Sequence, residues 1–236
     1  MSDTNKQTMQ FLFGDRELVL KVADLLVEPV DVIVNPANGS LSHGGGVAGQ
    51  ISQQGGEIIQ KESDLFVKEH GTLESGMVAF TSAGRLPFEA IIHAVGPVMG
   101  EGHEQRKIEQ AVSSSLMLCN MHDWNSVAFP AISSGIFSVP LEISARAFFR
   151  AITSFWDARM DTAPGKVVIC LTEKSFQPFF DAFQQASKQP ENETHQTFKT
   201  MIPKQLSEAE LPTGVVELTE QDISELENDD VSDWFK

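Results

Sequence analysis

Apolar and polar residues recur along the chain with two periods, one typical of strands and one typical of helices. Short apolar runs that suit strands covered on both faces lie at Gln10–Phe13, Leu18–Val22, Val30–Asn35, Met77–Ser82, Ala90–Val95, Ser126–Pro130 and Val167–Leu171. Helix-like stretches lie between or after them, at Val47–Gln54, His103–Met121, Leu141–Ala158 and Phe176–Lys188. Strands that alternate with helices predict an α/β fold, with a mixed central sheet covered by helices on both sides.

The pattern changes near Ser187. Residues 188–236 include 12 acidic and 4 basic residues, which gives a balance of −8, and they are rich in Gln, Glu, Asn, Thr and Pro. Such a composition buries too little apolar surface to offset the entropy of ordering. We therefore expect a folded domain over 1–187 and a flexible acidic tail over 188–236, with a short helix near 218–227. The aromatic pair Trp234 and Phe235 is either solvated or part of a motif that binds a protein partner.

Composition and charge narrow the functions open to the chain. It has 236 residues, 41% of them hydrophobic, and a net charge of −16. This charge argues against binding to DNA or to an anionic membrane surface, because both need clustered Lys and Arg. Cys119 and Cys170 offer no disulfide framework, and the six histidines show no metal-ligand spacing. With no secretory signal and no run of ~20 apolar residues, we expect a cytoplasmic protein. We also expect a monomer without a metal or cofactor.

The first candidate site is the loop that follows the strand Val30–Asn35. It covers residues 36–43 and is followed by three glycines, Gly44–Gly46, that open a helix. Glycines let the backbone approach a ligand closely, and amides at a helix start suit a phosphate. With Gly49 the loop also satisfies G-x-G-x-x-G, but the dinucleotide fingerprint needs its first glycine directly after the strand. The H-G-G-G run resembles the oxyanion loop of lipases, but the chain has no G-x-S-x-G motif.

A second loop, Ala131–Pro140, follows the strand Ser126–Pro130 and leads into the helix from Leu141. Pro140 suits a first helical turn and Ser138 suits a cap. Loops at the carboxyl ends of strands in an α/β sheet share one rim, so the two loops can grip a diphosphate from both sides. Neither loop contains Lys or Arg, and neutral N–H groups and helix dipoles would hold the phosphates instead.

Motifs throughout the predicted domain resemble those of the macrodomain family. In order along the chain they are Asp24-Leu25, Val30–Asn38, His43–Gly49, His93–Pro97 and Ser133–Phe137. The resemblance covers residues from about Leu18 to Ala186 and is closest to coronaviral macrodomains and the first macrodomains of large mono-ADP-ribosyltransferases. It implies a three-layer α/β/α fold that binds ADP-ribose in a cleft at the rim of the sheet.

The resemblance also implies roles for single residues. Asp24 would accept a hydrogen bond from the adenine amino group, beside the Leu25 amide. Asn38 would bond the hydroxyls of the distal ribose, the one not attached to adenine, and Phe137 would lie over that ribose. The diphosphate would be lined on one side by Gly44, Gly45, Gly46, Val47 and Ala48, and on the other by Ser133, Ser134, Gly135, Ile136 and Phe137. Ala37, His43 and Pro97 complete the predicted ligand contacts.

Most of these roles have a structural alternative. Asp24 is otherwise an ordinary cap, Asn38 a residue that stabilises its own loop, and Phe137 a part of the core. For His43 a ligand contact, a structural donor and a titrating acid stay open. Asn35 and His93 are expected to be structural.

Ala48 bears on the choice between an enzyme and a binding module. Hydrolases of the family often have an Asp at this position to activate water, so Ala48 removes the most obvious general base. The subgroups that this chain resembles also have Ala, and members of them hydrolyse; a phosphate oxygen of the ligand can position the water. We predict that the protein hydrolyses mono-ADP-ribose from modified proteins at ester links to Glu or Asp, because a carboxylate leaves without a general acid. Asn38, Gly45 and Phe137 are the predicted catalytic residues. The alternatives are a non-catalytic ADP-ribose reader, an O-acetyl-ADP-ribose deacetylase and an NAD-dependent oxidoreductase.

Overall fold

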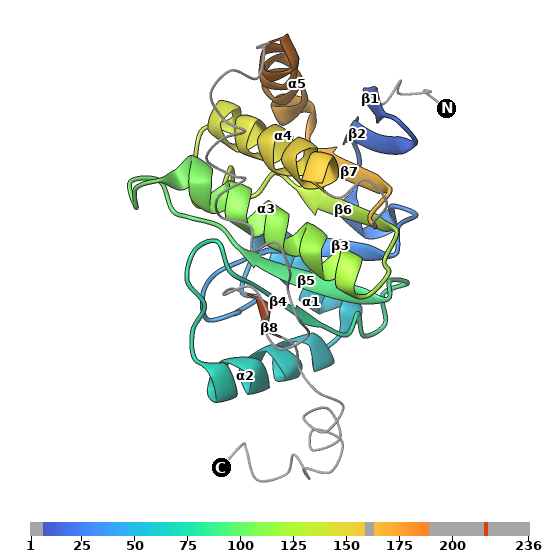
Figure 1. Ribbon diagram of the computed structural model, residues 1–236. Helices are drawn as coiled ribbons and strands as arrows, with labels where there is room; N and C mark the ends of the chain where they lie inside the picture. Colours follow the sequence, from blue (N-terminus) through green and yellow to red (C-terminus); the bar gives the residue numbers. More distant parts are fainter. Residues whose placement is uncertain (1–6, 159–162, 189–214, 217–236) are drawn as a thin grey trace, which may run out of the picture.

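The structure, a computed structural model, describes residues 7–158, 163–188 and 215–216. Its middle layer is a mixed sheet in the order β1-β2-β7-β6-β3-β5-β4-β8 (Figure 1). The parallel strands at its centre are β2 (Arg16–Val22), β7 (Lys166–Leu171), β6 (Ser126–Pro130), β3 (Val32–Ala37) and β5 (Ala90–Val95). β1 (Thr8–Phe13) pairs antiparallel with β2, and β4 (Val78–Thr81) pairs antiparallel with β5.

One short strand comes from the predicted tail. β8 (Val215–Val216) runs parallel to β4, with Val215 opposite Val78 and Val216 opposite Ala79. The helix expected near 218–227 and the aromatic pair that follows it lie outside the described residues.

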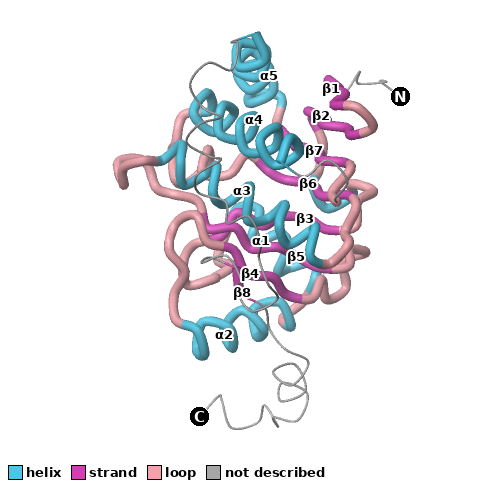
Figure 2. Tube along the Cα trace, viewed as in Figure 1, coloured by secondary structure: helices cyan, strands magenta, loops and turns pink. Residues whose placement is uncertain are grey.

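Helices cover both faces of the sheet, which confirms the predicted three-layer α/β/α fold (Figure 2). On one face lie α3 (Glu104–Met121), α4 (Leu141–Ala158) and α5 (Glu173–Lys188). On the other lie α1 (Gly46–Gly55), α2 (Ile58–His70) and the 3₁₀ turn η1 (Leu25–Val27). Within the described residues no helix is both long enough and apolar enough to cross a membrane.

The strands are apolar on both faces because each face meets a helical layer. In β3, Val32 and Val34 belong to the core shared with α3, α4 and α5. Ile33, between them, belongs to the opposite core with Ile51 of α1 and Ile59 of α2. This alternation follows from the two-residue period of a strand. It explains why nearly continuous apolar runs predicted the strands of the centre.

Among the described residues, helix α2 is the one long element that the apolar pattern did not predict. Its buried side includes Glu62 and Ser63 next to Ile59 and Phe66, so polar residues interrupt the apolar stripe. Both polar side chains are bonded. The Glu62 carboxylate accepts hydrogen bonds from the amide and hydroxyl of Ser82, and the Ser63 hydroxyl donates to the carbonyl of Ile59.

The order of strands brings the two candidate loops together. β3 and β6 are parallel neighbours, with Val32 opposite Val127 and Ile33 opposite Ala128. The loop into α1 and the loop into α4 therefore leave the same edge of the sheet side by side. This satisfies the geometric condition for a site built from both loops.

Candidate functional site

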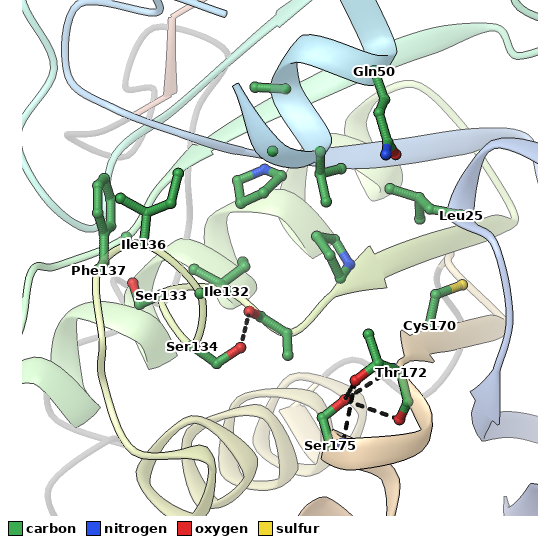
Figure 3. A pocket seen from close by; sticks show the side chains of 18 of the residues that line it. Leu25, Gln50, Ile132, Ser133, Ser134, Ile136, Phe137, Cys170, Thr172 and Ser175 are labelled. Atoms are coloured by element: carbon green, nitrogen blue, oxygen red, sulfur yellow. Dashed lines mark hydrogen bonds between the residues drawn. The ribbon is translucent and has the colours of Figure 1, made fainter. Parts of the chain in front are cut away.

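A cleft of about 1030 Å³ lies at the carboxyl ends of the parallel strands (Figure 3). Its volume is at the upper end of the range for small-molecule sites, which suits an elongated ligand. All predicted ligand contacts except His43 and Pro97 line it: Asp24, Leu25, Ala37, Asn38, Gly44, Gly45, Gly46, Val47, Ala48, Ser133, Ser134, Gly135, Ile136 and Phe137. Pro97 is buried, whereas its neighbour Gly96 lines the cleft.

The first loop presents the free end of helix α1 to the cleft. Gly45 is the N-cap and provides no side-chain hydrogen bond, so the first amides of the helix stay open to a ligand. Gly46 has a φ of 59°, in the left-handed region that favours glycine. A Cβ atom built on Gly44 or Gly45 would meet no atom within 4 Å, so both backbones border open space. Such a helix start is suited to an anion.

Asn38 organises this loop with its side chain. Its Oδ1 accepts hydrogen bonds from the Ser40 hydroxyl at 3.0 Å and from the Ser42 amide at 3.1 Å. Its Nδ2 donates to the Ser42 carbonyl at 3.2 Å. The loop-stabilising alternative for Asn38 is therefore realised. Because Asn38 also lines the cleft and an amide group has two N–H donors, one donor remains for a ligand.

A buried network of polar side chains supports the same loop from the protein interior. The Nδ2 of Asn35 lies 3.3 Å from the Nδ1 of His43 and 3.0 Å from the Nδ1 of His93. The His43 Nε2 lies 2.9 Å from the Ser63 hydroxyl, and the His93 Nε2 lies 2.9 Å from the Thr81 hydroxyl. The two rings stack with centroids 4.9 Å apart. His43 is thus a buried residue beside the cleft with structural hydrogen bonds, which favours the structural alternative among its three predicted roles.

The network is consistent with two neutral histidines. If Asn35 donates to both Nδ1 atoms, each imidazole carries its proton on Nε2 and donates it to a hydroxyl. Burial lowers the pKa of His43, although the charge of Asp64 opposes this shift. Burial and the nearby His43 hold the pKa of His93 well below its usual value. The first loop is therefore supported by two imidazoles, those of His43 and His93, that resist protonation.

The second loop is held by close packing and by hydrogen bonds, including those from the Ser134 and Ser144 hydroxyls to the carbonyls of Ala131 and Ile132. Ser133 has a φ of 63° and is buried, and its carbonyl accepts a hydrogen bond from the Val139 amide. A Cβ atom at Gly96 would overlap the Oγ of Ser133 and the Cγ2 of Ile132, so only glycine lets this loop approach the end of β5. Across the cleft, the Cδ1 of Ile136 lies 3.8 Å from the Cβ position of Gly46.

The predicted cap of helix α4 is wrong. Ser138 has a φ of 57°, outside the extended conformation of an N-cap residue, and its hydroxyl donates to the Ile136 carbonyl. The carbonyl of Pro140 instead accepts the first bonds of the helix, from the amides of Ile143 and Ser144.

The opposite end of the cleft is formed by η1 and the start of α5. Asp24 caps η1, because its Oδ1 accepts a hydrogen bond from the Leu26 amide at 3.0 Å, and it also lines the cleft. Thr172, Lys174 and Ser175 follow β7 and line this end too, and the sequence interpretation missed them. The rule that loops after parallel strands share one rim applies to β7 as well, and it could have identified them.

Charge is distributed unevenly along the cleft. Its ionisable lining side chains are Asp24, Cys170 and Lys174, all near Leu25 and Thr172, whereas Ile136 and Phe137 lie on the far side (Figure 3). Burial raises the pKa of the Cys170 thiol to about 12, so this group is not a nucleophile at neutral pH. In the described part of the chain no group of His, Cys, Asp or Glu side chains could hold a metal ion.

The chain resembles known proteins in sequence. A family model, Macro domain, matches residues 34–148. An uncharacterized protein of Saccharolobus solfataricus is 42% identical over 128 residues, which is 53% of this chain and 69% of that protein. The O-acetyl-ADP-ribose deacetylase of Klebsiella pneumoniae is 35% identical over 111 residues, which is 46% of this chain and 63% of the deacetylase.

The fold resembles a solved bacterial structure. A glycine-to-valine variant of the Oceanobacillus iheyensis macrodomain, solved with ADPR, superposes with a TM-score of 0.72 at 27% identity. The superposition covers 78% of this chain and 100% of that one.

Proposed function

Because this chain belongs to the Macro domain family, we propose that it binds ADP-ribose in the cleft and hydrolyses ester bonds between ADP-ribose and protein carboxylates. The observation that carries the proposal is the pair of amide-rich loops that border one cleft after two neighbouring strands. The O. iheyensis neighbour, which was solved with ADPR, supports the choice of ligand.

The diphosphate lies between Gly44–Gly46 and Ser133–Ile136. Backbone amides from both loops and the positive end of the α1 dipole supply the attraction, without a Lys or Arg in either loop. This arrangement suits a chain with a net charge of −16, because the favourable potential is local and needs no basic surface. A ligand held by fixed backbone donors must match their geometry closely.

The two ends of the cleft set the direction of the ligand. Adenine lies at the Asp24 end, where Asp24 Oδ1 is already bonded to Leu26 and Oδ2 accepts from the adenine amino group. The distal ribose lies at the other end, beside Phe137 and the remaining N–H of Asn38. The bond to be cleaved is therefore at the end without ionisable side chains.

Hydrolysis at that end proceeds without a protein base, because Ala48 stands where many hydrolases of the family have Asp. A diphosphate oxygen orients a water molecule toward C1″ of the distal ribose. The water oxygen bonds to C1″, the bond from C1″ to the carboxylate oxygen breaks, and the carboxylate leaves with the electron pair. The proton of the water passes to solvent. Positioning supplies the rate enhancement, and carboxylate esters are favoured over serine ethers, whose alkoxide needs an acid.

Deacetylation of O-acetyl-ADP-ribose is the second candidate activity. The K. pneumoniae relative bears that name, and its bond is also an ester on the distal ribose. In deacetylation the water adds to the acetyl carbonyl carbon rather than to C1″, the bond from that carbon to the ribose oxygen breaks, and the ribose oxygen takes up a proton as acetate leaves. The two activities therefore share the cleft but not the reacting carbon. The Ala48 position and the Ser133–Phe137 motif further lead us to group the chain with the coronaviral and transferase-associated macrodomains.

One preparation tests the function in two steps. Calorimetry should give ADP-ribose a micromolar Kd and NAD a clearly weaker one, because nicotinamide extends beyond the distal ribose. Three substrates are then incubated with the protein. Two are esters, glutamate-linked ADP-ribosyl protein and O-acetyl-ADP-ribose, and the third is the O-glycoside of a serine-linked ADP-ribosyl peptide. We expect the first two to be cleaved and the third to stay intact. If the protein bound ADP-ribose but left all three substrates intact over hours, it would be a non-catalytic reader, and the proposed hydrolase activity would be contradicted.

A further inference from the structure

Exposed apolar side chains gather beside the Phe137 end of the cleft. Val98 is 49% exposed, Met99 is 50% exposed and Ile136 is 83% exposed. The Met99 amide donates a hydrogen bond of 2.9 Å to the Phe137 carbonyl, so the two segments that carry these residues are joined. We call Val98, Met99 and Ile136 the distal patch. Among the described residues, the other large exposed hydrophobic side chains lie on β1, η1 and the end of α3.

The segment that carries Val98 and Met99 has a defined conformation. The Glu101 amide donates to the Val98 carbonyl, which closes a tight turn, and Glu101 Oε2 accepts from the Val98 amide at 3.0 Å. Glu101 is anchored in turn by Lys107, 2.7 Å away, and by the Ser75 hydroxyl. In Figure 1 this segment projects on the left, before α3.

A second carboxylate fixes the rest of the segment. Glu104 Oε1 accepts hydrogen bonds from the amides of Gly100 at 2.8 Å and Gly102 at 3.0 Å. The bond to Lys107 lowers the pKa of Glu101, and backbone amides lower that of Glu104, so both carboxylates stay ionised at neutral pH. Two half-exposed apolar side chains are thus presented on a segment that needs little further ordering, which favours binding.

The position of the patch follows from the direction of the ligand in the proposed function. With adenine at Asp24, the C1″ atom lies between Asn38 and Phe137. A polypeptide attached there has to leave the cleft at this end, next to Ile136 and the Met99 segment. Free ADP-ribose and O-acetyl-ADP-ribose end before this surface.

We propose that the distal patch binds the polypeptide that carries the modification, by contact with an apolar side chain adjacent to the ADP-ribosylated residue. This inference rests on the proposed function. The occupant is a segment without further acidic residues near the modification, because the chain carries a net charge of −16 and Glu101 and Glu104 flank the patch. The patch thereby distinguishes protein-linked ADP-ribose from the small esters.

The test compares peptides that carry one ADP-ribosyl group through a hydrolysis-resistant link. One peptide has leucines next to the modified residue, a second has aspartates there, and free ADP-ribose is the reference. We expect the wild-type protein to bind the leucine peptide about tenfold more tightly than free ADP-ribose. The aspartate peptide should show no such gain.

A double variant, Val98→Ser with Met99→Ser, should abolish the gain for the leucine peptide and leave the Kd of free ADP-ribose within about twofold of wild type. Leu12→Ser is the matched control, because Leu12 is 70% exposed on β1, away from the cleft. Equal affinity of wild type for all three probes would overturn the inference, as would equal weakening of free ADP-ribose and peptide in the double variant. No binding of ADP-ribose at all would overturn the proposed function itself.

Discussion

The two loops that face each other across the cleft keep their shapes by different means. The loop before α1 is held by side chains: Asn38 bonds its own loop, and Asn35 joins His43 and His93 beneath it. The loop before α4 is held by steric fit of Ser133 against Gly96, by backbone bonds, and by local bonds from the hydroxyls of Ser134 and Ser144 to the carbonyls of Ala131 and Ile132. Both leave amides free for a ligand, but the first depends on a network that contains two buried histidines, whereas the second requires the absence of a Cβ atom at Gly96.

This difference indicates how each loop can be altered independently. Changes of histidine protonation should act on the first loop, and changes of volume at Gly96 should act on the second. Direct obstruction of the space between them should have the largest effect of all, because it removes the ligand without disturbing either support.

Gly45→Glu should block the space between the two loops and thereby prevent ADP-ribose from binding. The substitution puts a side chain and a negative charge where the diphosphate is proposed to bind, and ADP-ribose affinity should fall by at least about 100-fold, or about 2.8 kcal/mol. Gly45 has a φ of −177°, which any residue adopts, and its Cβ position meets no atom within 4 Å, so the fold should be kept.

Calorimetry measures the affinity, and circular dichroism checks the fold. Gln53→Glu is the control, because it adds the same charge to an exposed position of α1 that does not line the cleft. Unchanged affinity in the glycine variant would show that the ligand does not pass the first loop.

Gly96→Ala should act on the second loop through stability. The added methyl group overlaps Ser133 and Ile132, and we expect the free energy of unfolding to fall by about 2 kcal/mol. Denaturant unfolding measures the change. Gly135→Ala is the matched control, because a Cβ there meets no atom within 4 Å, and its effect should stay below about 0.5 kcal/mol. Similar losses in both variants would argue against steric support.

Asn38→Ala tests the side-chain support of the first loop. It removes the bonds to Ser40 and Ser42 as well as the proposed contact with the distal ribose. We expect turnover of the glutamate-linked ester to fall about tenfold, with a smaller rise in the Kd of ADP-ribose. Ser40→Ala removes only the bond from the Ser40 hydroxyl and should change turnover little. Equal losses in both variants would leave Asn38 with a purely structural role.

Much of the fold could be predicted because its signals are local. The two-residue alternation of Val32, Ile33 and Val34 reflects a strand between two helical layers, and the bounds of α4 follow from its apolar stripe and from Pro140. The sequence also predicted that the loops after β3 and β6 share a rim, because this depends only on parallel strands.

The helix that the sequence missed has a physical cause, which is buried polar pairing. Glu62 and Ser63 hid α2 from the apolar pattern, and Ser63 is also the partner of His43. Without that helix nothing in the pattern indicated that His43 is buried, so its structural role could not be separated from a ligand contact or a titrating acid. The sequence did not identify Gly96 as a lining residue, because its close contact with Ser133 depends on tertiary packing.

The smallest expected effect is the response of the first loop to pH. Burial lowers the pKa values of His43 and His93 in the folded protein, whereas the unfolded chain has the usual value of about 6.5. Below that pH the unfolded state binds more protons than the folded state, so the neutral network contributes full stability above about pH 6.5 and loses it as the pH falls. We expect the free energy of unfolding to be lower at about pH 5 than at about pH 7 from this source.

The control separates the network from the other titrating groups. His43→Gln should reduce the pH dependence of the unfolding free energy, with the part due to burial of His93 remaining, whereas His70→Gln, on the exposed side of α2, should leave it as in wild type. Protonation of His43 puts an N–H on Nδ1, opposite the Nδ2 donor of Asn35, so ADP-ribose affinity should also weaken toward low pH. A variant in the second loop, Gly135→Ala, should keep the wild-type pH profile of affinity. If affinity fell with pH equally in His43→Gln and wild type, the first loop would not depend on its histidines.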